Sequence, residues 1–267
     1  MSGVRYSRQS FLGENSNAAI SDCIIGVMGL GGGGSHAIQQ LAHIGFQRYV
    51  IYDDDVVEES NLNRLVGATV VDALAETPKL HLAKQMVFGL QPNAEVDAHA
   101  RRWQDCPGPL HRCHIVIGCV DSYKGREELE NECRRHLIHY IDIGMDVHGT
   151  NPPVIGGQVI LSSPGGHCMR CMGFLTEAKL AEEGRRYGNA GGRPQVIWSN
   201  GVLASTGVGL AVDLVCNWTT RRATGVYLSY DGNEFTVKPS LLLRNLDGVV
   251  CPHYMNMDLG PPVLTEL

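Results

Sequence analysis

The sequence contains no unbroken apolar run of the ~18 residues that a membrane-spanning helix requires. Its N-terminus, MSGVRYSR, also lacks the hydrophobic core of a secretory signal peptide. Basic residues are in deficit, with 22 Lys and Arg against 28 Asp and Glu and a net charge of −6, which argues against nucleic acid as the main partner. We therefore expect a cytoplasmic protein that binds neither a membrane nor nucleic acid.

Complete disulfide pairing is excluded as well, because the nine cysteines are an odd number. Cytosolic thiols stay reduced unless they bind a metal. The 267 residues are 43% apolar and contain no internal repeat or low-complexity linker. We expect a single domain over 1–267, with a helical arm over about 1–22 and a C-terminal extension of the sheet over about 150–267, which also carries a crossover segment and a cysteine loop.

The chain does contain strand-like and helix-like segments in alternation. Strands are expected over 23–28, 49–53, 95–100, 114–118 and 139–143, with helices over 35–44, 72–89 and 124–136. This alternation predicts an α/β fold with a Rossmann-like, twisted and mostly parallel sheet.

The pattern changes after about residue 150. We expect a strand over Val154–Leu161, a mobile glycine-rich loop over 188–194, an apolar helix of small residues over 201–218, and a hairpin of Val226–Tyr230 and Glu234–Val237. These last strands predict an antiparallel extension of the sheet.

A glycine-rich turn follows the first strand and leads into a helix-compatible segment. Glycines let the backbone turn tightly and approach a phosphate, and the positive end of the following helix favours the anion. The glycines of this turn that we expect to bind nucleotide are Gly29, Gly31, Gly32 and Gly34. A glycine-rich surface turn is the alternative, but it does not explain the acidic residues downstream.

Those acidic residues, Asp53 and Asp55, close the second strand about twenty residues after the glycine turn, where a carboxylate can bind ribose hydroxyls. Asn61 and Arg64 follow, and both supply hydrogen-bond donors to phosphate oxygens.

Lys79 comes directly after Pro78 at the expected start of a helix, where a cation can reach a phosphate. Asp121 follows the fourth strand, and ligands of open α/β sheets gather at the carboxyl ends of strands. A carboxylate there can hold Mg²⁺ that bridges phosphates. Taken singly, an isolated Arg or Lys of this kind is more simply explained as a surface charge or a helix cap.

Cys168 and Cys171 form a C-x-x-C pair on a loop. In a cytosolic protein such a pair is usually half of a zinc site or a redox pair, and a zinc site needs two more ligands.

Taken in order, these motifs resemble those of the ThiF/MoeB-like superfamily, which has the ubiquitin-activating-enzyme fold. The matching segments are RYSRQ at 5–9, the glycine turn, Asp53-x-Asp55 with SNLNR at 60–64, Pro78-Lys79, and Asp121 with Arg126 behind it. The resemblance covers about residues 4–255. It implies ATP- and Mg²⁺-dependent adenylation of the C-terminal glycine of a small ubiquitin-like or sulfur-carrier protein, with release of pyrophosphate.

The resemblance also implies residue roles. Asp53 and Asp55 would lie by the ribose and Asp121 would bind Mg²⁺, while Asn61, Arg64 and Lys79 would hold the triphosphate. Arg8 resembles an arginine that reaches the ATP of the opposite subunit, which implies a homodimer.

Family members commonly carry a second C-x-x-C near the C-terminus, where this chain has Cys251-Pro252-His253-Tyr254. His253 is therefore the expected substitute ligand, with His167 as a second candidate. A structural zinc site of Cys168, Cys171, Cys251 and His253 follows, and two unmetallated pairs are the alternative.

One family feature is missing. Many members carry a nucleophilic cysteine in the crossover segment, but residues 172–215 contain no cysteine. Cys216 is expected to be buried in an apolar helix and unreactive, and Cys119 could line the nucleotide site but is more simply explained by packing. We favour a reaction that stops at the acyl-adenylate, which then passes to sulfide, an amine or the thiol of a downstream conjugating or sulfur-transfer protein. The alternative is a thioester-forming enzyme of a bacterial ubiquitin-like conjugation system.

Functions of other classes fit the residues less well. An NAD-dependent oxidoreductase would use the glycine turn and ribose acid but has no use for Arg64, Lys79 and Asp121. A tRNA-modifying dehydratase of the same superfamily would need a basic face, which the composition does not favour. A non-catalytic scaffold would not need a near-complete set of ATP-contacting residues.

Overall fold

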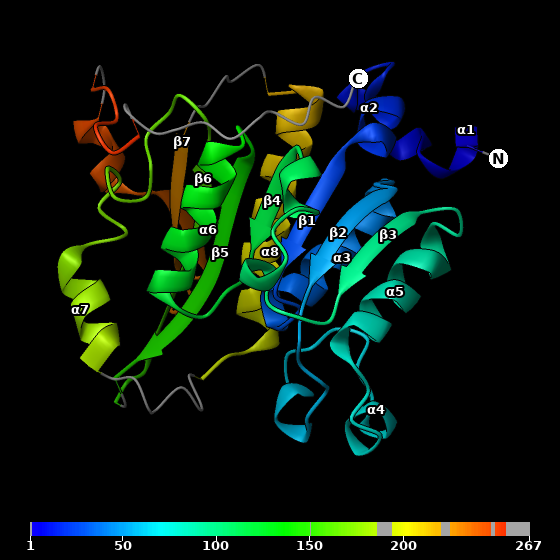
Figure 1. Ribbon diagram of the computed structural model, residues 1–267, viewed down its shortest axis with the longest axis horizontal. Helices are drawn as coiled ribbons and strands as arrows, with labels where there is room; N and C mark the ends of the chain where they lie inside the picture. Colours follow the sequence, from blue (N-terminus) through cyan, green and yellow to red (C-terminus); the bar gives the residue numbers. More distant parts are fainter. Residues whose placement is uncertain (1, 150, 186–193, 220–224, 247–248, 255–267) are drawn as a thin grey trace.

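The computed structural model, which describes residues 2–149, 151–185, 194–219, 225–246 and 249–254, contains one continuous eight-stranded sheet (Figure 1). Its strand order is β3-β2-β1-β4-β5-β6-β7-β8. The strands are β1 Ile24–Met28, β2 Arg48–Tyr52, β3 Glu95–His99, β4 Ile115–Gly118, β5 His139–His148, β6 Val154–Ser162, β7 Gly225–Asp231 and β8 Thr236–Pro239.

The first five strands pair in parallel and the last three add antiparallel, which confirms the predicted fold class. β5 runs beyond the expected 139–143 because β6 pairs with it over nine residue pairs, from Tyr140 opposite Ser162 to His148 opposite Val154. β5 is therefore the strand at which the sheet changes from parallel to antiparallel.

Helices cover both faces of the sheet (Figure 1). One layer contains α2 Ser16–Asp22, α3 Gly32–Ile44, α5 Lys79–Leu90 and α8 Ile197–Cys216, and the other contains α6 Tyr123–Arg135 and α7 Glu177–Arg185. Short elements are α1 Ser2–Arg5, α4 Val70–Leu74 and the 3₁₀ turns η1 Ser7–Leu12, η2 Glu59–Asn61, η3 Trp103–Asp105, η4 Leu110–Arg112 and η5 Leu241–Asn245. Side chains alternate along β1, so Ile25 and Val27 pack into the first layer and Met28 into the second.

The predicted helix over 72–89 is wrong, because the chain forms two helices there, α4 and α5. Pro78 cannot donate a backbone hydrogen bond and disfavours helical geometry at the preceding residue. Thr77 instead accepts a hydrogen bond from the N–H of Val57 (2.8 Å), which pairs this segment with the loop after β2. The break lets α5 begin at Lys79.

Other boundaries shift by a few residues. α3 begins at Gly32 instead of residue 35, so the glycine turn itself forms the first helical turn. The helix expected over 201–218 is α8, which begins at Ile197 and ends before Asn217, a residue in the left-handed conformation (φ +50°). Except for Pro194, the predicted mobile loop over 188–194 lies outside the described residues.

Within the described part of the chain, α8 is the one helix that is long and apolar enough to cross a membrane by length and composition. Its inner face packs against α3, β5 and β6, where Leu203, Ala204, Val208 and Ala211 are buried in the core. The packing explains the apolar composition of this face without a bilayer.

Candidate nucleotide site and metal centre

The loops that follow β1, β2 and β4 meet at one edge of the sheet, because these three strands are parallel neighbours. Gly29 donates its N–H to the carbonyl of Tyr52 (2.9 Å), and Cys119 donates to the carbonyl of Met28 (2.8 Å). Gly29 has φ +88°, and a Cβ at this position would lie 2.7 Å from the carbonyl oxygen of Cys119. Only glycine fits here, so the turn is fixed against the loop after β4.

The remaining glycines divide into packed and open positions. A side chain at Gly34 would overlap the carbonyl oxygen of Gly29, and one at Gly32 would overlap the side-chain amide of Asn200. Gly31 is the residue before the first turn of α3, and a methyl group on it would meet no atom within 4 Å. The open space lies at a helix N-terminus, where backbone N–H groups and the helix dipole favour an anion. The turn therefore fits a phosphate group.

Gly34→Ala and Gly31→Ala form a matched pair for this assignment. We expect Gly34→Ala to lower the free energy of unfolding by about 1–3 kcal/mol, because the methyl group overlaps backbone. Gly31→Ala should change it by less than about 0.5 kcal/mol and should weaken ATP binding, since its methyl group projects into the open space. Urea denaturation and calorimetric ATP titration measure both effects; unweakened ATP binding by Gly31→Ala would place the phosphate elsewhere.

Asp53, Asp55 and Lys79 form a connected group at this edge. Asp53 accepts hydrogen bonds from the N–H of Leu30 (2.6 Å) and the N–H of Asp55 (3.0 Å), so it ties the glycine turn to the end of β2. Burial raises the pKa of the Asp53 carboxyl, and Lys79 offsets part of this rise. Lys79 Nζ lies 2.6 Å from Asp55 Oδ2, and the Asp55 side chain is 66% exposed. Asp55 thus presents a solvent-facing carboxylate close to the glycine turn.

Asn61 lies in η2, just beyond these acids, and its side chain is buried. Its Oδ1 accepts from the N–H of Glu58 (3.3 Å), and its Nδ2 donates to Ser60 Oγ (3.2 Å). These hydrogen bonds within the segment show that Asn61 stabilises the turn that leads to Arg64.

Arg64 is half-buried and donates through Nη1 to the Ser60 carbonyl (2.6 Å) and to Asn63 Oδ1 (3.0 Å). The same segment is tied to the first turn of α3, because Val66 donates its N–H to Ser35 Oγ (3.1 Å). The guanidinium is therefore held on a segment anchored beside the glycine turn.

Asp121 is exposed at the same edge, between β4 and α6. Ser122 caps α6 by accepting from the N–H of Gly125 (2.9 Å). The carboxylate of Glu183, from α7, accepts from the next two N–H groups, those of Tyr123 (2.9 Å) and Lys124 (3.0 Å). The N-terminus of α6 is thus satisfied by protein groups, and Asp121 is an exposed carboxylate two residues beyond Cys119, which lies against the glycine turn. A carboxylate is the kind of oxygen ligand that Mg²⁺ prefers.

Sequence reasoning assigned no role to Asn200, which lies over Gly32. This residue is buried in the first turn of α8 and donates through Nδ2 to the Val196 carbonyl (3.1 Å). Just before α8, the Gln195 carbonyl accepts from Asn63 Nδ2 (3.0 Å). The N-terminus of α8 therefore covers the glycine turn. The sequence feature that could have indicated this role is a polar residue, Asn200, at the start of an otherwise apolar helix.

Arg8 is the predicted site residue that the structure keeps apart from the others. It is exposed on η1, and the neighbouring Gln9 donates through Nε2 to the Ile44 carbonyl (2.9 Å) at the C-terminal end of α3. The 13-residue helix α3 separates this end from the glycine turn by about 20 Å. Arg8 therefore lies outside the nucleotide site of its own chain.

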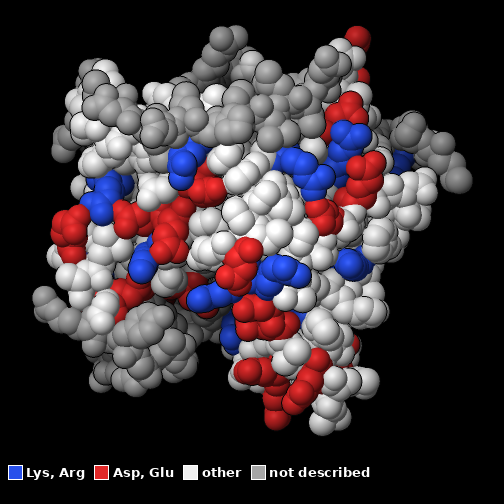
Figure 2. Space-filling view, viewed as in Figure 1, with Lys and Arg blue, Asp and Glu red and all other residues white. Residues whose placement is uncertain are grey.

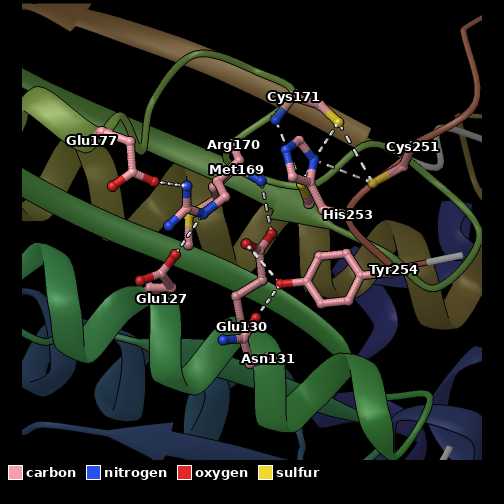
Figure 3. A network of polar contacts seen from close by, with 11 residues as sticks. Glu127, Glu130, Asn131, Met169, Arg170, Cys171, Glu177, Cys251, His253 and Tyr254 are labelled. Carbon is pink, nitrogen blue, oxygen red and sulfur yellow. Dashed lines mark hydrogen bonds and ion pairs between the residues drawn. The ribbon is translucent and has the colours of Figure 1, made fainter. Parts of the chain in front are cut away.

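A second centre is formed by Cys168, Cys171, Cys251 and His253, whose donor atoms all lie within 4.8 Å of one another (Figure 3). His253 Nδ1 lies 3.4 Å from Cys168 Sγ and 3.3 Å from Cys171 Sγ, and the Sγ atoms of Cys171 and Cys251 are 3.5 Å apart. A tetrahedral Zn²⁺ site has ligand–ligand separations of about 3.4–3.8 Å. The structure places His253 with the three cysteines, as expected of the fourth ligand, whereas His167 is directed to the Val249 carbonyl (2.6 Å).

The loop that carries the centre is fixed to α6 (Figure 3). Glu130, a buried carboxylate, accepts from the N–H of Met169 (2.8 Å) and lies 3.4 Å from the Tyr254 hydroxyl, which also donates to Asn131. Tyr254 occupies the position of the expected fourth cysteine. It anchors the C-terminal segment to α6 instead of binding metal.

Two cysteines considered in the sequence, Cys119 beside the nucleotide site and Cys216 at the far end of α8, lack the features of a nucleophile. Burial raises the pKa of Cys119 to about 12, so this thiol stays protonated although it lies beside Gly33. Cys216 is half-buried instead of fully buried as expected, because it lies in the last turn of α8, and burial raises its pKa as well. Neither cysteine is poised to form a thioester.

Similarity to known proteins extends over most of the chain. The sequence matches the ThiF family over residues 6–248. A SAMP-activating enzyme E1 of Haloferax volcanii is 33% identical over 175 residues, which span 63% of this chain and 61% of that protein. A molybdopterin-synthase adenylyltransferase of Salmonella typhimurium is 27% identical over 255 residues, 93% of this chain and 96% of that protein.

Among solved structures, E. coli MccB with AMPCPP and MccA superimposes with a TM-score of 0.72 at 18% identity, over 90% of this chain and 71% of that one. This likeness concerns the fold. The chain spans about three fifths of the length of the Haloferax relative and nearly all of the Salmonella relative.

Proposed function

The chain belongs to the ThiF family, and on that premise we propose that it adenylates the C-terminal glycine of a small ubiquitin-like or sulfur-carrier protein. ATP is consumed with the help of Mg²⁺, and pyrophosphate is released. The observation that carries the proposal is the convergence at one sheet edge of an open phosphate cradle at Gly31, the exposed carboxylates of Asp55 and Asp121, and the cations Arg64 and Lys79.

The reaction forms a bond between a carboxylate oxygen and the α-phosphorus of ATP and breaks the bond from that phosphorus to the β-phosphate oxygen. All reacting groups are anionic, so the chain's task is to position them and to balance their charge. Arg64 and Lys79 supply positive charge, and the N-terminus of α3 supplies backbone N–H groups. Mg²⁺ held by Asp121 would neutralise phosphate charge.

We propose that the product is the acyl-adenylate, which is passed to an acceptor outside this chain. The raised pKa of Cys119 and the absence of cysteine in 172–215 support this proposal. Formation of a thioester on the chain itself is the alternative.

The Cys168, Cys171, Cys251 and His253 centre is proposed to hold structural Zn²⁺. Three thiolates and one imidazole match the ligand types of closed zinc sites, and the donor separations fit tetrahedral geometry. Bound there, the metal would join the loop after β6 to the C-terminal segment.

The other classes of function find less support. An oxidoreductase gives no role to the cations and to Asp121, and a scaffold gives none to the open cradle at Gly31. RNA binding calls for a broad basic surface. Figure 2 shows Lys and Arg interspersed with Asp and Glu on the face viewed, with acidic side chains gathered near α4.

ATP–pyrophosphate exchange tests the proposed function. Purified protein with Mg²⁺ is assayed against a panel of small glycine-ending ubiquitin-like and sulfur-carrier proteins, with intact-mass detection before and after thiol treatment. Exchange with a member of the panel and no thiol-sensitive adduct is the expected result. A thiol-sensitive adduct would show that the product is a thioester on this chain and not a free acyl-adenylate. Failure of the protein to bind ATP would overturn the proposed adenylation.

We also propose that the protein is a homodimer paired through α8. The outward face of this helix exposes Trp198 (55%) and Val202 (39%) beside the small residue Gly209. At the far end of α8, Trp218 packs edge-to-face on Phe11 of the N-terminal arm, with ring centroids 5.9 Å apart. An apolar face with small residues suits close helix packing around a twofold axis.

The positions of the two ends of α8 explain how a second protomer could contribute to the nucleotide site. Its N-terminus covers the glycine turn through Asn200, and its C-terminus lies about 30 Å away beside the arm that carries Arg8. Antiparallel pairing of two copies of α8 therefore brings Arg8 of one protomer toward the nucleotide site of the other.

Mixing two inactive variants tests this arrangement. Arg8→Ala and Asp121→Ala should each be inactive alone, whereas a subunit-exchanged mixture should regain about a quarter of wild-type exchange, because half of the dimers carry one intact site. Analytical ultracentrifugation is used to check that both variants are dimers. A mixture that stays inactive would contradict a role of Arg8 across the interface.

A further inference from the structure

We infer that His111, Glu132 and His136 form a second metal site, for a divalent transition cation such as Zn²⁺. His111 Nε2 lies 2.6 Å from Glu132 Oε1, and His136 Nε2 lies 3.7 Å from the same oxygen. The three donor atoms, one from each residue, all lie within 4.8 Å of one another. Two imidazoles and a carboxylate thus converge on one point.

The fold holds these side chains together from two elements. Glu132 and His136 are four residues apart at the C-terminal end of α6 and share one face of the helix. His111 lies on η4, which is anchored by the fully buried Leu110. The rings of His111 and His136 stack with centroids 3.5 Å apart and planes at 14°. This stacking brings both Nε2 atoms to the same carboxylate.

The ligand set matches known zinc chemistry. Two histidines and one glutamate with a fourth position for water form a common open zinc site, with donor separations of about 3.4 Å. The observed 2.6 and 3.7 Å bracket this value, so a cation requires small side-chain shifts and a tilt of the stacked rings away from each other. The side chains are between 9% and 21% exposed, which leaves an approach from solvent.

The site is distinct from the cysteine centre. Its three ligands contain no sulfur, and the cysteine loop and the C-terminal segment are fixed to other residues of α6, Glu130 and Asn131. A metal here would join the segment before β4 to the end of α6. The simpler alternative is that His111 donates a hydrogen bond to Glu132 and His136 stacks upon it without any cation.

Cobalt titration separates the two possibilities. Metal-free, full-length protein without a histidine tag is titrated with Co²⁺, and bound zinc is counted by elemental analysis of the protein as purified. We expect two equivalents of Co²⁺, one with a thiolate-to-cobalt charge-transfer band and one with d–d bands alone. Glu132→Gln keeps the side-chain shape and an oxygen acceptor for His111, and it should weaken the second equivalent at least about tenfold while sparing the first.

Glu128→Gln, an exposed substitution on the same helix, is the matched control and should retain both equivalents. Wild-type protein that binds a single equivalent would overturn the proposal, as would Glu132→Gln that binds two with unchanged affinity. If a variant fails to fold, the number of Co²⁺ ions bound by the wild-type protein still decides whether the second metal site exists. Because the readout is metal binding, the result is independent of whether the protein adenylates a carrier.

Discussion

Asp121→Ala is expected to lower ATP–pyrophosphate exchange about a thousandfold while leaving the melting temperature unchanged. The carboxylate is exposed, so the fold does not depend on its burial, and Arg126 behind it keeps its own buried partner, Asp142. What would be lost is the oxygen ligand proposed for Mg²⁺, and phosphate charge would then be left unbalanced when the substrate carboxylate attacks. Exchange and thermal unfolding are measured on the same preparation.

Asp54→Ala is the control for Asp121→Ala. Asp54 is also an exposed acid at this edge, between Asp53 and Asp55, and the family motifs assign it no role. We expect its activity to equal that of the wild type, and raised Mg²⁺ to restore part of the activity of Asp121→Ala. Wild-type exchange by Asp121→Ala would remove the magnesium assignment, whereas equal losses in both variants would show a general effect of negative charge.

The sequence predicted what depends on local chemistry and on the order of motifs. Alternating apolar segments indicated the parallel sheet, because buried strands and amphipathic helices have distinct periods. Gly29 and Gly34 were predicted to form a tight turn, and in the structure a side chain at either position would overlap backbone atoms. His253 was found from a deviation in a paired-cysteine pattern, and the structure brings it to the cysteines.

Contacts between segments that are far apart in the sequence could not be predicted in the same way. Asn200 reaches Gly32 from a helix more than 150 residues further along the chain, and no spacing rule links the two. His111 and Glu132 likewise meet because η4 packs against the end of α6. The single helix expected over 72–89 did not agree with the helix start expected at Lys79, and the structure has the start, because Pro78 interrupts the backbone hydrogen bonds of a continuous helix.

Cys171→Ser tests the largest expected contribution to stability. Zinc present at a thousandfold excess over its dissociation constant stabilises the folded state by about 4 kcal/mol. For a chain of this size the loss corresponds to a fall in melting temperature of about 10 °C. The variant should also lose one equivalent of zinc, because Cys171 contacts both Cys251 and His253 and so links the loop after β6 to the C-terminal segment.

Cys106→Ser is the matched control for this substitution, since Cys106 is half-buried and lies outside both metal clusters. Its zinc content and melting temperature should remain those of the wild type. A chelator should lower the melting temperature of the wild type by more than that of Cys171→Ser, because the variant has already lost the metal of the cysteine centre. If the chelator lowers both by the same amount, the stabilising metal is bound elsewhere, and the thiol and imidazole donors at this centre contribute only their packing.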